Sequence, residues 1–310
     1  MREQQTQKYP SLRDEIDQNS PSLREIQYFF MKISIVTATF NSGATVRDTL
    51  ESVLRQNYKN YELIIKDGGS KDNTLEVCRE YEEAFGGKMK IISCPDRGIY
   101  DAMNQGIRAA TGDVVGLLNS DDFYTSFDVL TSIVRQFERT PEADAVYADI
   151  HYVDCNDTTR LKRYYSSRLF RPGWMRLGFM PAHPSFYCRK SVYERFKLDA
   201  SAIEGWKGET DCAYFNTTYK IAADFECLLR MIYCGRIRTE YIWKDFVTMR
   251  HGGASSSGAA AHKQINRDHL RALKENKVYS NIGILSLRYI YKIGEVMAGR
   301  IRKAAMYMLL

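Results

Sequence analysis

The chain has 310 residues, of which 44% are hydrophobic and 26% are charged, and its formal net charge is +6. These values are typical of a folded globular protein, and so modest a charge does not predict binding to nucleic acid. The seven cysteines are scattered without a C-x-x-C pair, which argues against a disulfide framework or a zinc site and indicates a reducing, cytoplasmic location.

The first 30 residues are polar and lack the pattern of a helix or a strand. We expect residues 1–30 to form a weakly ordered extension. Met31 stands directly before the first strong strand pattern, so we expect it to be the natural start and the extension to be dispensable. No signal peptide is visible, and no apolar run of about 18 residues would span a bilayer.

Strand and helix patterns alternate along residues 33–122. Runs rich in β-branched residues predict buried strands, and apolar residues at helical spacing predict the helices between them. The strands are expected at 33–39, 61–65, 89–93 and 114–118, with helices near 46–54, 74–85 and 99–110. This alternation predicts βαβ units and a mostly parallel sheet.

The fourth of these strands ends in two adjacent carboxylates, Asp121 and Asp122. In an open α/β sheet, ligands bind at the carboxyl ends of the strands. Hard oxygen ligands at that edge suit Mg²⁺ or Mn²⁺. The same residues, Asn119 to Asp122, are also typical of a turn that caps a following helix, and the pair by itself does not decide between the two interpretations.

The regular alternation stops after the acid pair. We expect a helix at 126–139, followed by a long strand at 145–153 with an antiparallel partner at 160–165. A loop at 168–185, a short helix at 189–196 and irregular chain at 197–219 should come next. This part of the chain should end with a strong helix at 221–233, a last strand at 242–249 and a flexible segment at 252–258.

The tail, residues 259–310, is predicted to be helical and basic, with ten Lys or Arg and three acidic residues from His262 onward. An apolar stripe follows helical spacing through Ile282, Leu285, Tyr289, Ile293 and Val296. Such a helix can lie on an anionic membrane surface or pack on the domain with a basic outer face, and the pattern supports both interpretations.

Six segments in this order resemble the motifs of the family 2 glycosyltransferases, and particularly the bacterial enzymes that build surface polysaccharides. They are ISIVTATFN at 33–41, DGGSKDNT at 67–74, DRGIYDAMNQGIRAATGD at 96–113, LLNSDD at 117–122, HPSFYCRKSVYERF at 183–196 and YKIAADFECLLRM at 219–231. The resemblance implies an α/β fold of the GT-A type, with a Rossmann-like, mostly parallel central sheet flanked by helices and a C-terminal helical tail. It implies a domain at 31–258, with a nucleotide-binding half at 31–122 and an acceptor-side half at 123–258.

The resemblance also implies roles for individual residues. Asp224 matches the catalytic base, Asp122 the metal-binding acid, and Asp121 the acid that reaches the ribose or sugar. Donor-binding roles fall on Thr37, Thr39, Asn41, Asp67, Asp101 and Asn104. The family more often has two acids where this chain has Asp67 and Gly68, which puts the recognition of the base in doubt. The implied cofactor is Mn²⁺ or Mg²⁺.

Two histidines and the proposed base have competing interpretations. His183 lies in the acceptor-side motif, and it fits either a site residue or a buried, hydrogen-bonded histidine. His251 fits either a Mn²⁺ ligand or an ordinary strand-end residue. Asp224 alone would be typical of an acid that stabilises a helix N-terminus, and the motif context favours the catalytic role.

The predicted function is inverting transfer from a UDP- or GDP-sugar to a saccharide or polyprenyl-linked saccharide acceptor, at the inner face of the membrane. A divalent cation would neutralise charge on the leaving diphosphate, and a carboxylate would take the acceptor's proton. The alternatives are a sugar nucleotidyltransferase and a non-catalytic nucleotide-sugar-binding protein. The first would need a basic triphosphate loop where this chain has Phe40 to Gly43, and the second is expected to lose the acids. The absence of G-x-G-x-x-G after the first strand argues against a dinucleotide dehydrogenase.

Overall fold

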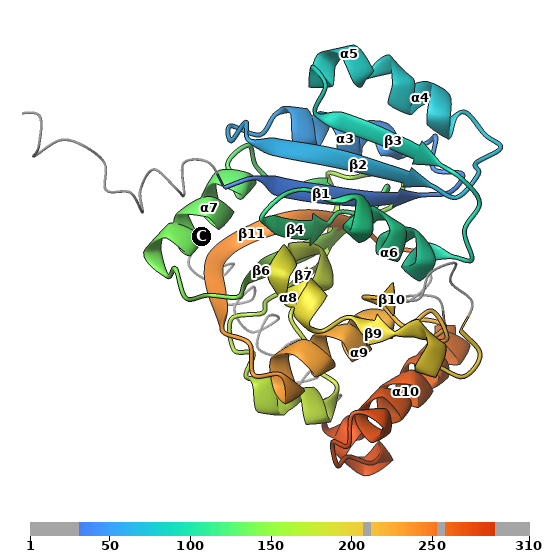
Figure 1. Ribbon diagram of the computed structural model, residues 1–310, viewed down its shortest axis with the longest axis vertical. Coiled ribbons are helices and arrows are strands. Elements are labelled where there is room, and N and C mark those ends of the chain that lie inside the picture. Colours follow the sequence, from blue (N-terminus) through green and yellow to red (C-terminus); the bar gives the residue numbers. More distant parts are fainter. Residues whose placement is uncertain (1–30, 207–211, 253–257, 289–310) are drawn as a thin grey trace, which may run out of the picture.

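The computed structural model describes residues 31–206, 212–252 and 258–288. A single large, curved sheet runs through the molecule, with helices on both of its faces (Figure 1). Its strand order is β3-β2-β1-β4-β8-β6-β11-β5, and β7 pairs with the C-terminal part of β6. The predicted extension at 1–30 lies outside the described residues.

The first half of the sheet is the parallel unit that the alternating pattern predicts. Strands β3, β2, β1 and β4 run in the same direction, so their carboxyl ends meet at one edge. The bounds are β1 (Ile33–Thr39), α3 (Val46–Leu54), β2 (Tyr61–Asp67), α4 (Thr74–Glu80), α5 (Glu82–Phe85), β3 (Met89–Ser93), α6 (Ile99–Ala109) and β4 (Val114–Leu117).

Each face of the sheet packs against its own apolar core, which explains why the sequences of these strands are almost continuously apolar. On β1, Ile33 and Ile35 belong to the core beneath α3 and α7, whereas Val36 belongs to the core beneath α6 and α9. All three side chains are at most 1% exposed. Because successive strand residues point to opposite faces, both faces of this half must be apolar.

The second half of the sheet is mixed. Strand β8 (Tyr187–Arg189) lies antiparallel between β4 and β6 (Ala145–Val153), and β11 (Thr239–Arg250) lies parallel to β6. The predicted antiparallel partner of β6 is present as β7 (Leu161–Tyr165). Strand β8 was not predicted, and its three residues are too few to show an alternating pattern. The remaining elements are β5 (Phe123–Tyr124), α7 (Val129–Arg139), η1 (Pro172–Leu177), η2 (His183–Ser185), α8 (Lys190–Arg195), β9 (Leu198–Asp199), η3 (Ala200–Ala202) and β10 (Cys212–Ala213).

Gly116 makes the contact between the two halves possible. A Cβ atom at this position would lie 2.0 Å from the ring of Tyr187, the residue opposite it on β8. The Tyr187 ring is fully buried, and its hydroxyl hydrogen-bonds that of Tyr124 on β5. The ring can therefore cross β4 only where that strand has no side chain.

The predicted helix at 221–233 divides into two parts. Helix α9 (Ala223–Leu228) is followed by the π-helix η4 (Leu229–Cys234), which ends with a hydrogen bond from the N–H of Gly235 to the carbonyl of Arg230 at 2.9 Å. The α- and π-helical periods differ too little for a segment of this length to separate them by apolar pattern. Helix α10 (Gly258–Glu275) packs against α9 (Figure 1).

The predicted apolar stripe of the tail is only partly described. Leu285 is fully buried in the same core as α9, whereas the side chain of Ile282 is 56% exposed. Tyr289, Ile293 and Val296 lie outside the described residues. Within the described part of the chain, the helices are too short or too polar to cross a membrane.

Candidate active site

A cavity of about 250 Å³ opens at the carboxyl edge of the sheet, where the sequence predicts a ligand site. Four of the predicted site residues line it: Asp121, His183, Asp224 and His251. They come from the loop after β4, from η2, from α9 and from the residue after β11. The fold thus brings together side chains from four separate parts of the sequence.

The acid pair lies in a short loop that is hydrogen-bonded to α3 and to the N-cap residue of that helix. The hydroxyl of Thr45 donates to the carbonyl of Ser120 at 2.9 Å, and that of Thr49 donates to the carbonyl of Asp122 at 2.7 Å. In this arrangement Asp121 lines the cavity, whereas Asp122 is fully buried beneath it. The two carboxylates therefore have different surroundings, as the resemblance implies, but the more accessible one is Asp121.

Burial has a large effect on both carboxyl groups. It raises the pKa of Asp121, although Arg250 and His183 oppose the shift. Burial and the neighbouring Asp121 charge raise the pKa of Asp122 well above its usual range. Its Oδ2 atom accepts a hydrogen bond from Asn119 at 3.2 Å, and its Oδ1 atom has no hydrogen-bond partner among the described residues. An unpartnered buried carboxylate oxygen is costly unless something compensates for it.

The donor set fits Mg²⁺ or Mn²⁺. Carboxylate oxygens suit both cations, and the His251 imidazole on the same cavity wall is compatible with Mn²⁺. The unpartnered Asp122 oxygen is the kind of atom that a cation satisfies. The described residues contain no cluster of three or more His, Cys, Asp or Glu side chains placed to hold a metal. A cation here would therefore take further ligands from a bound phosphate or from water.

Two cationic residues on the cavity wall, Arg250 and Lys220, were missed by the sequence reasoning. The Arg250 guanidinium donates to the carbonyl of Asp121 at 2.5 Å and pairs with the carboxylate of Asp48. A signal was available for Arg250, because it lies between the predicted strand at 242–249 and the candidate site residue His251. A basic residue that ends a strand at the carboxyl edge of the sheet is a candidate for phosphate binding.

Asp224 is the second residue of α9, and its Oδ2 atom lies 3.4 Å from Nδ1 of His183. Burial raises the pKa of Asp224, and His183 partly offsets that shift. Burial lowers the pKa of His183, against the opposing charges of Asp224 and Asp121. A neutral imidazole thus stands beside a carboxylate that is a stronger base than a free aspartate.

A second cavity, of about 180 Å³, adjoins the first at this pair. His183 and Asp224 line both cavities, together with Tyr152, Ile221 and Met249. The second cavity is bounded mainly by apolar side chains, among them Met180, Pro181, Ile221 and Ile265. Asp224 therefore stands where two separate ligands could meet.

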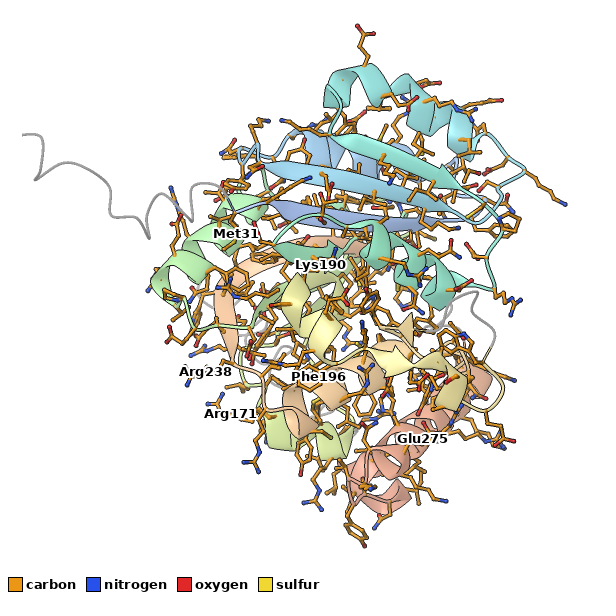
Figure 2. All side chains as sticks on the ribbon, viewed as in Figure 1. Met31, Arg171, Lys190, Phe196, Arg238 and Glu275 are labelled. Atoms are coloured by element: carbon orange, nitrogen blue, oxygen red, sulfur yellow. The ribbon has the colours of Figure 1, made fainter. Side chains whose placement is uncertain are left out.

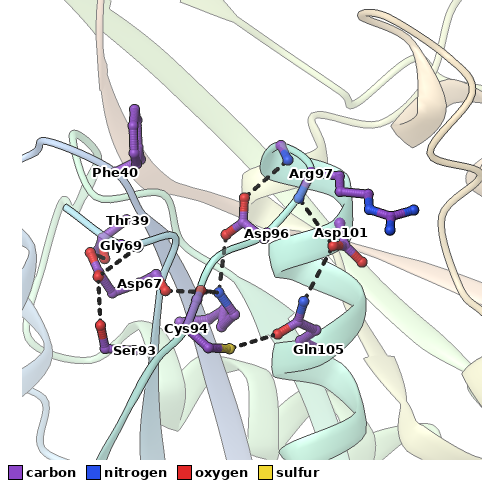
Figure 3. A network of polar contacts seen from close by, with 12 residues as sticks. Thr39, Phe40, Asp67, Gly69, Ser93, Cys94, Asp96, Arg97, Asp101 and Gln105 are labelled. Atoms are coloured by element: carbon purple, nitrogen blue, oxygen red, sulfur yellow. Dashed lines mark hydrogen bonds and ion pairs between the residues drawn. The ribbon is translucent and has the colours of Figure 1, made fainter. Parts of the chain in front are cut away.

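Asp67 lies at the end of β2 and is fully buried in a hydrogen-bond network (Figure 3). Its carboxylate accepts from the N–H of Gly69 at 2.9 Å and from the hydroxyls of Ser93 at 2.9 Å and Thr39 at 3.2 Å. Burial alone would raise the pKa of Asp67, but its hydrogen bonds, chiefly from Ser70, lower it overall. The carboxylate thus joins the ends of β1, β2 and β3 and is already well supplied with donors.

The other predicted donor-binding residues lie around the cavity without lining it. Thr37 is fully buried, and its hydroxyl has no hydrogen-bond partner among the described residues. Asn41 is exposed, with φ of 50°, and its side chain accepts from the N–H of Lys71 at 2.9 Å. Asp101 is 4% exposed and accepts from the N–H of Arg97 at 3.1 Å (Figure 3).

Asn104 also lies behind the cavity wall, and Tyr100 and Met103 of the same helix form the wall in front of it. Its Oδ1 atom accepts from the N–H groups of Tyr214 at 3.0 Å and Phe215 at 2.8 Å, and its Nδ2 atom donates to the carbonyl of Phe215 at 2.9 Å. These contacts fix the segment after β10 against α6. In the structure Asn104 holds protein backbone and does not face the cavity.

Part of the sequence is similar to known glycosyltransferases. The PGL/p-HBAD biosynthesis glycosyltransferase of Mycobacterium bovis is 34% identical over 117 residues, which is 38% of this chain and 46% of that protein. The poly-beta-1,6-N-acetyl-D-glucosamine synthase of Staphylococcus epidermidis is 34% identical over 114 residues, or 37% of this chain and 27% of that protein. The matched segment thus spans less than half of these relatives.

Solved structures confirm the predicted fold. Staphylococcus aureus TarS 1-349 in complex with UDP has a TM-score of 0.57 at 16% identity, and the match covers 78% of this chain and 65% of that one. The mannosyltransferase PcManGT from Pyrobaculum calidifontis, in complex with GDP-Man and Mn²⁺, has a TM-score of 0.51 at 15% identity, over 86% and 80% of the two chains.

The family model described as glycosyl transferase family 2 matches residues 34–196, more than half of the chain. This span includes the parallel half of the sheet, the acid pair and His183. Together with the fold and the clustered acids, the match confirms the resemblance drawn from the motifs. The chain belongs to glycosyl transferase family 2.

Proposed function

We propose that this chain transfers a glycosyl group from a UDP- or GDP-sugar to a hydroxyl of a saccharide or lipid-linked saccharide, with inversion at the anomeric carbon. The observation that carries the proposal is that Asp224 lies between two cavities, with Asp121 across the larger one. A single displacement needs the acceptor hydroxyl and the leaving diphosphate on opposite sides of the anomeric carbon, with the base within reach of that hydroxyl. Solved neighbours in complex with UDP, UDP-GlcNAc and GDP-Man support the donor class.

The larger cavity would bind the donor. Arg250 and Lys220 supply positive charge for the diphosphate, which becomes more negative as the sugar departs. A Mn²⁺ or Mg²⁺ ion, when bound, would neutralise the same developing charge. Asp121 and Asp122 would hold that ion, with Asp121 presenting its carboxylate to the cavity and His251 placed beside it. The acid pair therefore acts on the leaving group and takes no part in moving the proton.

Asp224 would act as the catalytic base. As the acceptor oxygen attacks the anomeric carbon, the bond from that carbon to the diphosphate breaks and the hydroxyl proton passes to the carboxylate. The raised pKa of Asp224 makes its carboxylate a better proton acceptor. His183, 3.4 Å away, would hold the carboxylate in position. Attack from the side opposite the leaving group gives the inverted product.

The second cavity would bind the acceptor. Its apolar walls suit an acceptor that carries a lipid or another apolar group next to the reacting sugar. The names of the relatives, which refer to PGL/p-HBAD and poly-N-acetylglucosamine synthesis, support a role in assembling surface glycans. We also propose peripheral contact between the tail and an anionic membrane at its cytoplasmic face, with Ile282 and Leu287 as the described exposed apolar residues. A chain truncated at Tyr279 that still sedimented with anionic vesicles would exclude this role for the tail.

A thermal-shift screen with UDP- and GDP-sugars, each with and without Mn²⁺, tests the proposed donor. We expect one sugar nucleotide to raise the melting temperature in a Mn²⁺-dependent manner, since a ligand that binds the native state alone stabilises it. Release of the nucleoside diphosphate with an acceptor extract, analysed by mass spectrometry, tests the reaction class. Stabilisation by sugar 1-phosphate with a nucleoside triphosphate, and pyrophosphate as product, would point instead to a nucleotidyltransferase.

A further inference from the structure

One face of α10 is attached to the segment that leads into α9. Arg271 donates to the hydroxyl of Thr218 at 2.8 Å, and the hydroxyl of Tyr219 donates to Glu275 at 2.6 Å. Glu275 is labelled at the end of α10 in Figure 2. Asp268, Arg271 and Glu275 are three and four residues apart along α10, so they lie on the same face of the helix. Helix α10 lies beyond residues 34–196, the part of the chain that matches the family model.

Asp268 makes the contacts nearest to the catalytic base. It is only 4% exposed, and its Oδ2 atom accepts from the N–H groups of Ile221 at 3.0 Å and Ala222 at 3.3 Å. Gln264 donates to its Oδ1 atom at 2.7 Å. Both oxygens of this buried carboxylate are therefore engaged, and one of them holds backbone two and three residues before Asp224.

These contacts hold the chain just before α9, at Ile221 and the N-cap residue Ala222. Ala222 occupies the N-cap position of α9 and has no side-chain oxygen with which to cap it. Asp268 supplies the acceptor from a neighbouring helix. On the other side, the hydroxyl of Tyr100 donates to the carbonyl of Ile221. The peptide before α9 is held on two sides, which restricts the direction in which Asp224 points.

The same helix closes the second cavity. Ile265 and His269 line it together with Asp224 and His183. The His269 ring stacks on Phe225, the residue after Asp224, with ring centres 3.9 Å apart. The residues of α10 thus touch the base-bearing helix on both its backbone and its side chains.

We propose that α10 is part of the catalytic unit, in which Asp268 is a positioning residue that orients Asp224 through the backbone of Ile221 and Ala222. The inference rests on the proposed role of Asp224 as the base. A misplacement of about 1 Å in a reacting group can cost roughly 100-fold in rate. Loss of the Asp268 contacts therefore lowers turnover more than donor affinity, because α10 does not line the donor cavity and of the two residues that Asp268 holds only Ile221 does.

The test compares Asp268→Ala with Asp268→Asn in the full-length protein. Turnover is measured as the acceptor-dependent release of UDP or GDP from UDP-GlcNAc or GDP-mannose, with Mn²⁺ and an acceptor extract, and donor affinity is measured by calorimetry. We expect turnover to fall roughly 10- to 100-fold in Asp268→Ala, with donor affinity within about two-fold of wild type. Asp268→Asn should recover part of the loss, because its side-chain oxygen can still accept from Ile221.

Two further variants separate positioning from stability. Leu273→Ala removes a fully buried side chain of the same helix that makes none of these polar contacts, so it should lower the melting temperature and leave turnover near wild type. Gln264→Ala removes the hydrogen bond that orients Asp268 and should lower turnover several-fold even if Asp268→Ala fails to fold. Equal turnover losses in Leu273→Ala and Asp268→Ala, or normal turnover in Gln264→Ala and Asp268→Asn, would overturn the proposal.

A failure of the proposed function has a different signature. In that case Asp224→Asn would keep full turnover, or the wild-type protein would bind no sugar nucleotide. If Asp224→Asn is inactive and the Asp268 variants are fully active, the base stands and only the positioning role falls.

Discussion

Nδ1 of His183 and Oδ2 of Asp224 lie 3.4 Å apart, although 40 residues of chain and several short elements separate them. The pair stands between the two cavities, so either ligand would meet both side chains. Both interpretations of His183 find support in this relationship. The histidine is partly buried and paired with Asp224, as a structural histidine would be, and it also lines both cavities.

Asp224→Asn should reduce turnover by roughly 10²- to 10⁴-fold, the usual contribution of a general base. Donor affinity should stay within a few-fold of wild type, because the amide keeps the size of the carboxylate. Turnover and calorimetric donor binding check this. His183→Gln should give a smaller loss, since the carboxylate remains but loses its neighbour. Full turnover in Asp224→Asn would place the base elsewhere.

Asp122→Asn should raise the melting temperature of the protein without ligand. The carboxylate is fully buried and has an unpartnered oxygen, so removing its charge relieves a desolvation cost. A gain of roughly 1 kcal/mol corresponds to about 2–4 °C. The same variant should lose the stabilisation by sugar nucleotide with Mn²⁺. Asp121→Asn, whose side chain lines the cavity, should lose that stabilisation with little change in the unliganded melting temperature. A Mn²⁺ effect that persists in both variants would contradict the assignment of this pair to the cation.

Asn104→Ala should destabilise the fold by roughly 3 kcal/mol, because three buried backbone groups of Tyr214 and Phe215 lose their partner. Urea unfolding measures this loss. Asn104→Asp should not restore stability, because its second carboxylate oxygen would face the carbonyl of Phe215 and a charge would be buried. If Asn104→Ala instead weakened donor binding with unchanged stability, the donor contact implied by the family motif would be the better account.

Glu62→Gln should destabilise the protein more at pH 7 than at pH 3.5. Burial would raise the pKa of Glu62, but hydrogen bonds from Lys32, Ser34 and Thr111 outweigh it and lower the pKa to about 2. Because the folded pKa lies below the unfolded one of about 4.3, the ionised group stabilises the fold above that value. The contribution is lost as the pH falls from about 4.3 toward 2.

Urea unfolding at the two pH values checks the Glu62 prediction. We expect a loss of about 2 kcal/mol at pH 7 and a smaller loss at pH 3.5. Glu142→Gln, at an exposed loop position, is the matched control and should show little difference at either pH. A loss for Glu62→Gln that is independent of pH would mean that the charge of this residue does not matter.

Much of the fold can be predicted from the sequence, because in the parallel half each local pattern agrees with the tertiary structure. Strands β1 and β3 and the long strand β6 begin and end where their β-branched runs do. The fully buried strands show apolar residues on both faces, and glycines and caps separate them from the helices. Strand β8 could not be predicted in the same way, since its place in the sheet depends on Gly116, which lies in a distant part of the chain.

The candidate site could be predicted only in part. Asp121 and Asp122 can be identified because they follow a predicted strand, and ligands bind at the carboxyl ends of the strands in a sheet of this kind. The difference in burial between them could not be predicted, because it depends on Thr45 and Thr49 of α3, which hold the loop. The contacts of α10 with the start of α9 were missed for a related reason: a basic amphipathic pattern does not reveal that Asp268 is buried against Ile221 and Ala222.

The position of β11 has a consequence for the order in which the protein folds. Strand β5 directly follows the acid pair, yet its sheet partner is β11, which lies more than one hundred residues further along the chain. During synthesis, strands β1 to β4 can pair soon after they emerge, whereas the far end of the acid loop must wait for β11. Contacts between residues so far apart in the sequence form slowly, because the chain loses loop-closure entropy before the contacts contribute any stabilisation. We therefore expect the pocket to be completed only after β11 has been made and has paired with β5.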